Sequence, residues 1–190
     1  MIYGNNLLHA ERVYLAAIRR DEMDIYHKWF TNPELSRLMS GGVTILRTRE
    51  RLEKAFDANA KDENSYYFGI RARDDDRLLG NCDIEIESQS SRHGWVGIFI
   101  GEPDDWGKGY GTEAMSILVR FGFMELNLHR ITLNVFAYNE RGIKSYEKIG
   151  FVHEGTSRQA LYRDGVYHDI HTMGILRREW MAKHHPDLVK

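Results

Sequence analysis

A glycine-rich segment that joins an apolar run to a helical pattern constrains the fold of this chain more than any other feature. The apolar run 95–100 precedes the segment Trp-Gly-Lys-Gly-Tyr-Gly-Thr at 106–112, and apolar residues then recur at helical spacing over 114–124. A strand, a glycine turn and a helix N-terminus in this order gather several backbone N–H groups around one space of anion size. Glycine also lets the backbone approach a ligand closely and adopt positive φ. The segment therefore predicts an anion-binding loop in an α/β fold.

The loop alone leaves the nature of the anion open. No Lys-Ser or Lys-Thr pair follows the glycines at the spacing of a P-loop. Gly107 and Gly109 begin the dinucleotide pattern, but Thr112 stands where that pattern has its third glycine. No acidic residue sits where a ribose partner should follow, which disfavours a nucleotide-binding regulatory domain. The remaining alternative is a turn that merely connects a strand to a helix.

A second motif follows the next β-rich run. Asn139 is a favoured N-cap residue. Gly150 suits the C′ position of a helix, with Phe151 closing the cap. Asn139 and Tyr146 are two helical turns apart and so share one side. The motif predicts a short helix over 140–149 with both ends marked.

Together the two motifs resemble those of the GNAT superfamily of acetyl-CoA-dependent N-acetyltransferases. The family's pyrophosphate loop, Gln/Arg-x-x-Gly-x-Gly/Ala, is similar to 106–111, and its later signature, Asn-x-x-Ala/Gly-x-x-x-Tyr-x-x-x-Gly-Phe, is similar to 139–151. The loop, an opening Arg-Val-Tyr-Leu at 12–15 and Tyr-Arg-Asp-Gly at 162–165 resemble the RimJ/RimL-like branch of ribosomal-protein alanine and spermidine acetyltransferases. The resemblance implies one GNAT domain over residues 1–190. Its implied fold is α/β (α+β), with a mixed, centrally splayed sheet of six to seven strands flanked by helices.

The resemblance also implies how acetyl-CoA would bind as co-substrate. In the family, the strand before the loop parts from the strand after the long helix, and the pantetheine arm lies in the opening. Here these strands would be 94–100 and 130–137. Backbone amides near Phe99 and Ile100 would then face the thioester carbonyl and stabilise its developing negative charge. The residues that the resemblance assigns to acetyl-CoA are Phe99, Ile100, Trp106, Gly107, Lys108, Gly109, Tyr110, Gly111, Thr112, Asn139 and Tyr146.

Acetyl transfer to an amine needs help with two protons. The ammonium must lose a proton before it attacks the thioester, and the departing thiolate benefits from gaining one. Tyr146, the tyrosine of the signature, is the implied acid. Its phenol has an ordinary pKa near ~10 and is protonated at neutral pH. The alternative role for Tyr146 is simple packing in an apolar stripe of the helix.

The general base is open among several candidates. Many relatives carry a glutamate on the strand before the loop, but Val96 stands at that position. Glu85 and Glu87 alternate along the neighbouring strand, so they share one face, and either could hold a water that relays the proton. His93 and His171 are further options. We assign no residue to a metal site.

The acceptor amine is the part of the reaction that the sequence describes least. Its pocket should be built from the first two helices, the turn region at 74–76 and the closing hairpin. Aromatic residues that could line it are Trp29, Phe30, Tyr66, Tyr67, Tyr162 and Tyr167. Acidic residues that could attract a cationic amine are Glu34, Glu85, Glu87 and Asp169. A protein N-terminus, a polyamine, an aminoglycoside or an amino-acid-like amine all fit. A non-catalytic acyl-CoA-binding module is the alternative, motivated by the missing strand glutamate.

Composition narrows the partners. The net charge of −2, without a basic block, argues against nucleic acid. No apolar run approaches the ~20 residues that span a bilayer. The single Cys82 cannot form an intramolecular disulfide, which fits a reducing cytoplasm. We therefore expect a cytoplasmic enzyme with a small-molecule or peptide amine acceptor and no nucleic-acid or membrane partner. The exposed sheet edges of the family suggest a homodimer.

Periodicity and turn signals predict the order of elements. The expected strands are 11–18, 65–73, 77–88, 94–100, 130–137, 152–162 and 166–174, and the expected helices are 21–30, 47–60, 109–125, 140–149 and 176–185. Asp21 is expected as the N-cap of the first helix, with Ile25 and Trp29 on its buried face. The segment 31–33 should stop that helix. The expected buried face of the long helix is Ala114, Ile117, Leu118, Phe121 and Met124.

Overall fold

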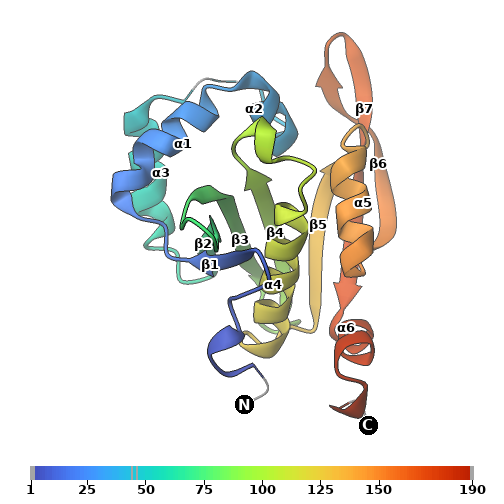
Figure 1. Ribbon diagram of the computed structural model, residues 1–190. Helices are drawn as coiled ribbons and strands as arrows, with labels where there is room; N and C mark the ends of the chain where they lie inside the picture. Colours follow the sequence, from blue (N-terminus) through green and yellow to red (C-terminus); the bar gives the residue numbers. More distant parts are fainter. Residues whose placement is uncertain (1–2, 44, 46, 189–190) are drawn as a thin grey trace.

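Seven strands form one open sheet in the computed structural model, which describes residues 3–43, 45 and 47–188 (Figure 1). The strands are β1 (Val13–Ala16), β2 (Ser65–Ala72), β3 (Leu78–Ser88), β4 (His93–Ile100), β5 (Arg130–Phe136), β6 (Val152–Arg163) and β7 (Val166–Leu176). Their order across the sheet is β1-β2-β3-β4-β5-β7-β6. Strands β4 and β5 pair in parallel, and the other neighbours pair antiparallel. The sheet is therefore mixed, as expected.

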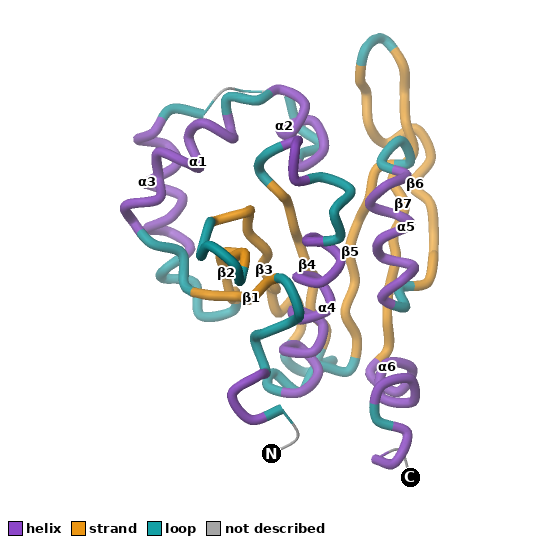
Figure 2. Tube along the Cα trace, viewed as in Figure 1, coloured by secondary structure: helices purple, strands orange, loops and turns teal. Residues whose placement is uncertain are grey.

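Helices cover both faces of this sheet (Figure 2). They are α1 (Met23–Phe30), α2 (Pro33–Met39), α3 (Arg49–Asn59), α4 (Tyr110–Met124), α5 (Glu140–Ile149) and α6 (Arg177–His184). Among the described residues, no helix is both long and apolar enough to cross a membrane.

The centre of the sheet is splayed between β4 and β5. Parallel pairing joins His93 to Arg130 and ends at the pair Trp95–Thr132. Beyond that pair, β4 continues to Ile100 and β5 continues to Phe136 without a further pairing between them among the described residues. This confirms the predicted central splay.

The main core lies between the sheet and the layer of α4 and α5. Leu118 and Phe123 of α4 are fully buried, together with Ile84 of β3 and Ile131 of β5. Trp180 of α6 extends this core, with its ring centroid 5.6 Å from that of Phe123. The predicted buried face of α4 was right for Ala114, Ile117 and Leu118, whereas Phe121 and Met124 are only half-buried.

A second apolar cluster lies on the opposite face, under the first three helices. Val96 and Phe99 are three residues apart on β4 and so point to opposite faces of the sheet; Val96 belongs to the main core and Phe99 to the second cluster. The ring of Phe99 meets Trp29 and Phe30 of α1 edge to face, with centroids 5.9 and 5.7 Å apart. Helices α1 to α3 thus form a separate layer over β3 and β4.

The expected elements are present, but one helix was missed. Helix α2 begins where the sequence predicted a stop. The side chain of Asn32 accepts a hydrogen bond from the backbone N–H of Glu34 (2.9 Å), and Pro33 occupies the first turn. Asparagine at the N-cap followed by proline is a helix start as well as a helix stop.

The predicted details of α1 were also wrong in two respects. A 3₁₀ turn, Arg20–Glu22, precedes the helix, so that Glu22 and not Asp21 stands at the N-cap. Ile25 is 39% exposed, whereas Tyr26 is buried beside Trp29. The register of the buried face is set by the aromatic cluster around Phe99, which short-range periodicity does not reveal.

Candidate active site

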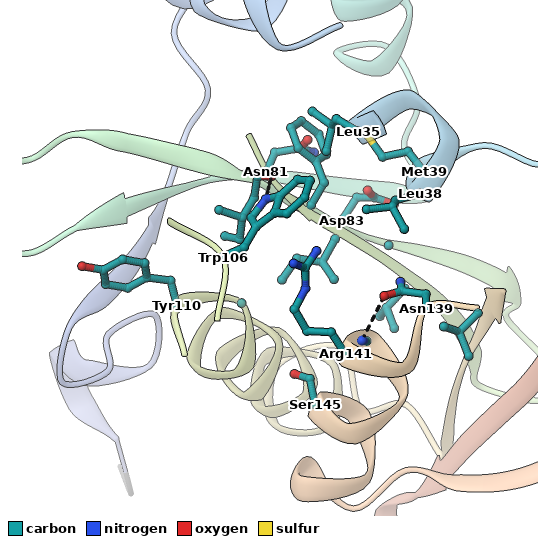
Figure 3. A pocket seen from close by; sticks show the side chains of 18 of the residues that line it. Leu35, Leu38, Met39, Asn81, Asp83, Trp106, Tyr110, Asn139, Arg141 and Ser145 are labelled. Atoms are coloured by element: carbon teal, nitrogen blue, oxygen red, sulfur yellow. Dashed lines mark hydrogen bonds between the residues drawn. The ribbon is translucent and has the colours of Figure 1, made fainter. Parts of the chain in front are cut away.

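One cavity of about 1120 Å³ connects the gap in the sheet with the space under the first helices (Figure 3). We call one part the loop end, formed by residues 106–112 and α5, and the other the helix-covered end, formed by α1 to α3 with Tyr67, Asn81 and Asp83. The splayed part of β4, 96–100, lines the passage between them. Of the residues predicted to bind acetyl-CoA, all except Lys108 line the cavity.

The loop end has the geometry of an anion site. Gly107 and Gly109 have φ of +75° and +87°, a region that favours glycine. Gly109 is the N-cap of α4, so the first N–H groups of that helix lack intrahelical partners. Free amides and the positive end of the helix dipole therefore meet at the cavity wall, an arrangement suited to a pyrophosphate.

Side-chain contacts brace this loop from both sides. Arg12 forms an ion pair with Glu113 of α4 (Nε–Oε1 2.6 Å) and donates to the backbone carbonyl of Lys108. On the other side, the indole N–H of Trp106 donates to the carbonyl of Ile100 (2.8 Å). The loop is thus tied to α4 and to the end of β4, and Arg12 of the Arg-Val-Tyr-Leu segment is part of the brace.

Basic side chains of α5 add positive charge to the loop end. Arg141, Lys144 and Lys148 line the cavity. The guanidinium of Arg141 lies over the ring of Trp106, 4.2 Å from its centroid (Figure 3). This combination of cations and free amides suits a ligand that carries several phosphates.

Helix α5 has both of its predicted ends. Asn139 accepts a hydrogen bond from the backbone N–H of Gly142 (3.1 Å), as an N-cap does. Gly150 has φ of +119°, and the amides of Gly150 and Phe151 both donate to the carbonyl of Tyr146 (3.1 and 3.0 Å). The two caps fix which residues of the helix face the cavity.

Tyr146 lines the cavity from α5. Its ring packs edge to face on Phe151, with centroids 6.0 Å apart. Burial raises the pKa of Tyr146 to about 12, so its phenol is protonated at physiological pH. Its hydroxyl makes no hydrogen bond to another described residue, and it can therefore donate to a ligand.

Asp83 is the group in this cavity that sequence reasoning missed. It lies on β3 opposite Gly97 of β4, and it lines the helix-covered end beside Tyr67 and Asn81 (Figure 3). Burial, together with the charge of Glu85, raises the pKa of Asp83 to about 6. It has no hydrogen bond or ion pair to the described residues. The alternation that pairs Glu85 with Glu87 also includes Asp83, and this was the available signal.

The candidates for the base that the sequence named lie away from the cavity. Glu85 and Glu87 are exposed near the other end of β3. Glu87 lies 3.3 Å from Nδ1 of His93, whose Nε2 contacts the hydroxyl of Thr132 (2.7 Å). His171 lies on β7 beside His153, and none of these four candidates lines the cavity.

Only two of the residues predicted to bind the acceptor line the cavity. Phe30 and Tyr67 line the helix-covered end. Trp29 is buried in the second cluster and donates to Glu102 (3.0 Å), while Tyr66 packs on Phe121 of α4. The others lie outside the cavity: Tyr162, Tyr167, Glu34, Asp169 and the turn 74–76. Tyr162 and Tyr167 stand exposed at the tip of the β6–β7 hairpin.

Comparison with known proteins decides the family. The sequence model of the acetyltransferase (GNAT) domain matches residues 12–152. The chain belongs to the GNAT acetyltransferase family. A probable N-acetyltransferase of Bacillus subtilis, YjcK, is 34% identical over 134 residues, which cover 70% of this chain and 73% of that protein. The protein described here is thus an acetyl-CoA-dependent N-acetyltransferase, in agreement with its glycine loop and its Asn139–Phe151 signature.

Relatives also lie in the branch that the sequence resembles. Spermidine N(1)-acetyltransferase of Escherichia coli K12 is 25% identical over 184 residues, which cover 92% of this chain and 91% of that protein. The fold is similar to that of spermidine N-acetyltransferase from Vibrio cholerae in complex with CoA and spermine. That likeness has a TM-score of 0.81 at 24% identity and covers 90% of this chain and 98% of that one.

Proposed function

We propose that this GNAT enzyme transfers the acetyl group of acetyl-CoA to a primary amine by direct attack within a ternary complex. The observation that carries the proposal is a single cavity that holds an anion site, a protonated phenol and a half-buried carboxylate without a partner among the described residues. The anion site accounts for the phosphates of acetyl-CoA. The phenol and the carboxylate account for the two proton transfers of the reaction.

Asp83 is the proposed base. An ammonium that enters the helix-covered end meets a carboxylate without another partner, so the two ions pair. Asp83 then accepts the proton that frees the nitrogen lone pair for attack. A carboxylate with a pKa near 6 is a better proton acceptor than an ordinary aspartate and is still ionised at neutral pH. This proposal replaces Glu85 and Glu87 in the role that the sequence left open.

Tyr146 is the proposed acid. When the tetrahedral adduct collapses, the C–S bond breaks and the phenol donates a proton to the departing sulfur of CoA. The second proton of the former ammonium leaves the nitrogen as the amide forms and restores the phenol. The hydroxyl lines the same cavity and has no competing partner among the described residues.

Backbone amides of β4 are the proposed oxyanion donors. Gly101 donates its backbone N–H to the carbonyl of Leu79 on β3 (2.8 Å). Successive backbone N–H groups of a strand point alternately to its two neighbouring strands, so the N–H of Phe99 also points to β3. The carbonyl of Ile100 instead meets the indole of Trp106, on the side of the gap. The amides of Ile98 and Ile100 therefore face the opening and are the donors we propose. Removing one such donor costs about 3 kcal/mol of transition-state stabilisation in other acyl transfers.

Thiol release from acetyl-CoA tests the proposed function. The assay is run with peptides that begin with Ala, Ser or Thr, with spermidine, with an aminoglycoside and with an apolar monoamine. Amine-dependent thiol release, with an acetyl group found on the acceptor by mass spectrometry, is the expected result. Binding of acetyl-CoA without release for any amine would contradict the proposal and favour an acyl-CoA-binding module.

The variant Tyr146→Phe tests the role of the acid. We expect kcat to fall by about 10²-fold or more, because the departing thiolate loses its proton donor. The dissociation constant of acetyl-CoA, measured by calorimetry, should stay within about threefold of the wild-type value, because phenylalanine keeps the packing on Phe151. Tyr138→Phe is the matched control, since the Tyr138 hydroxyl donates to the carbonyl of Arg37 outside the cavity. Full turnover by Tyr146→Phe would exclude Tyr146 as the acid.

Three further expectations belong to this proposal. Residues 1–190 act as a single domain, the enzyme works in the cytoplasm, and it forms a homodimer. Strand β6 is an edge of the sheet and is mostly exposed, which gives a dimer a surface to use. Analytical ultracentrifugation would measure the oligomeric state directly.

A further inference from the structure

Apolar side chains form much of the helix-covered end, and the polar groups that line it are those of Tyr26, Arg47, Asn59, Tyr67, Asn81 and Asp83. Six apolar side chains of α1, α2 and α3 converge there: Met23, Phe30, Leu35, Met39, Leu52 and Phe56. Most of them belong to the second apolar cluster. A ligand that enters this end must therefore lose its water against hydrocarbon and aromatic surface, which favours an apolar body.

Charge in the cavity is distributed in a way that limits the ligand further. Among the described lining residues, the carboxylates are Asp83, Asp105 and Glu140. Asp105 pairs with Arg77 (2.5 Å) and with Lys108 (3.3 Å). Glu140 pairs with Lys144 at the loop end (3.6 Å). Asp83 is the carboxylate left to receive a cation.

A cation of the protein already occupies the wall of the helix-covered end. Arg47 lines this end, and its guanidinium lies over the ring of Phe30, 4.9 Å from the centroid. Among the described lining residues, a second ammonium on the acceptor would find no carboxylate without a partner, only uncharged side chains and this guanidinium. An unpaired buried charge of that kind is strongly disfavoured.

We infer that the acceptor is a primary monoamine with a compact apolar body, and not a polyamine. Its ammonium pairs with Asp83, and its apolar body lies against α1 to α3. This inference rests on the proposed function and adds the class of amine. The resemblance to spermidine acetyltransferases lies in the fold and the acetyl-CoA loop, whereas the acceptor class depends on side chains of α1 to α3, which that resemblance does not settle.

A matched pair of amines tests the inference. n-Hexylamine and 1,5-diaminopentane have the same length and the same number of non-hydrogen atoms, and they differ by a second ammonium at the far end. With the full-length protein and saturating acetyl-CoA, we expect kcat/KM for n-hexylamine to exceed that for 1,5-diaminopentane by about tenfold or more. Phenethylamine should be accepted like n-hexylamine, and spermidine should be poor.

The outcomes separate this inference from the proposed function. Equal or faster turnover of 1,5-diaminopentane or spermidine would overturn the inference and leave acetyl transfer to amines intact. Absence of turnover with every amine, despite acetyl-CoA binding, would overturn both. Preference for the monoamines supports both.

A charge-insertion variant provides a second measurement. Met39 lies at the rim of the helix-covered end and is 36% exposed, so Met39→Glu should fold. The new glutamate gives the second ammonium of a diamine a carboxylate partner. We therefore expect the preference for n-hexylamine over 1,5-diaminopentane to shrink by about fivefold. Ile25→Glu is the matched control, because Ile25 has similar exposure (39%) but does not line this cavity. An unchanged preference in Met39→Glu, or the same change in both variants, would count against the inference.

Discussion

At the scale of single residues, the behaviour of Asp83 depends on the groups around it. Gly97 stands opposite on β4, and a Cβ there would lie 3.1 Å from Oδ1 of Asp83. The glycine thus keeps the space above the carboxylate open to a ligand. Burial and the charge of Glu85 hold its pKa near 6, close to the working pH of a general base.

The pH dependence of turnover follows from this pKa. Asp83 must be ionised to accept a proton, so kcat/KM should rise as the pH passes through about 6. In Asp83→Asn this limb should vanish and kcat/KM at pH 7.5 should fall by about 10²-fold. Glu85→Gln removes a neighbouring charge that raises the pKa of Asp83, so the limb should move to lower pH. Loss of the limb in Glu85→Gln, with the limb kept in Asp83→Asn, would instead make Glu85 the base.

Asp83 should also reduce the stability of the fold. A carboxylate whose pKa is raised by folding binds its proton more tightly in the folded state, so stability falls as the pH rises from about 4 to about 6. Asp83→Asn removes this penalty, and its free energy of unfolding at pH 7.5 should exceed that of the wild type by roughly 2–3 kcal/mol. At pH 4 the two proteins should be nearly equal. Urea titrations at both pH values measure the difference, and a variant that is less stable at pH 7.5 would contradict the assignment.

At the scale of elements, the glycine loop and α4 work as one unit. Gly109 gives α4 its N-terminus at φ of +87°, and a Cβ there would lie 2.5 Å from Nη2 of Arg12. The same residue therefore permits the turn and leaves room for the brace that Arg12 makes to Glu113. Backbone conformation and side-chain packing agree at this position, and the first amides of α4 point to the cavity.

Gly109→Ala should disturb both properties. A residue with Cβ is strained at this φ and displaces Arg12, so we expect a loss of about 1–2 kcal/mol of stability and at least tenfold weaker acetyl-CoA binding. Gly165→Ala is the matched control. Gly165 also has positive φ (+79°) but stands in the β6–β7 turn, with no atom within 4 Å of its added Cβ. Calorimetry measures the affinity of both variants for acetyl-CoA. Equal affinity in the two variants would contradict the proposal that the glycine loop binds acetyl-CoA.

At the scale of the whole molecule, the cavity exists because two helical layers enclose one splayed sheet. The layer of α4 and α5 supplies the loop end, and the layer of α1 to α3 supplies the helix-covered end. Gly101, just after β4, lets α1 approach the sheet, since a Cβ there would lie 2.0 Å from Cε2 of Trp29. A side chain at position 101 would therefore displace Trp29 and with it α1.

Gly101→Ala should affect the helix-covered end of the cavity and leave the loop end unchanged. Displacing Trp29 should destabilise the protein by about 1–3 kcal/mol and raise KM for the acceptor amine. The affinity for acetyl-CoA should change little, because the loop end is lined by residues 106–112 and α5, and Trp29 does not line the cavity. Gly155→Ala on β6, where no atom lies within 4 Å of the added Cβ, serves as the control. Steady-state kinetics and thermal unfolding are the measurements, and an acceptor KM equal to that of the control would contradict this division.

Short-range signals in the sequence determined the succession of strands and helices along the chain, the caps of α5 and the glycine loop. These features depend on neighbours a few residues apart: Asn139 caps its own helix, and Gly109 turns its own loop. Sequence reasoning missed α2 because the Asn32–Pro33 pair can end one helix and begin the next. It misplaced the buried face of α1 because Phe99, far along the chain, sets that face.

The tertiary structure decided which carboxylate of β3 lines the cavity, where the helix-covered end lies and which edge of β4 each backbone amide faces. Asp83, Glu85 and Glu87 are equivalent in the sequence pattern, since all three share one face of β3. They differ because α1 to α3 cover that face at Asp83 and leave Glu85 and Glu87 exposed. The cost of removing a charge from water depends on everything packed around it, and residues distant along the chain provide that packing.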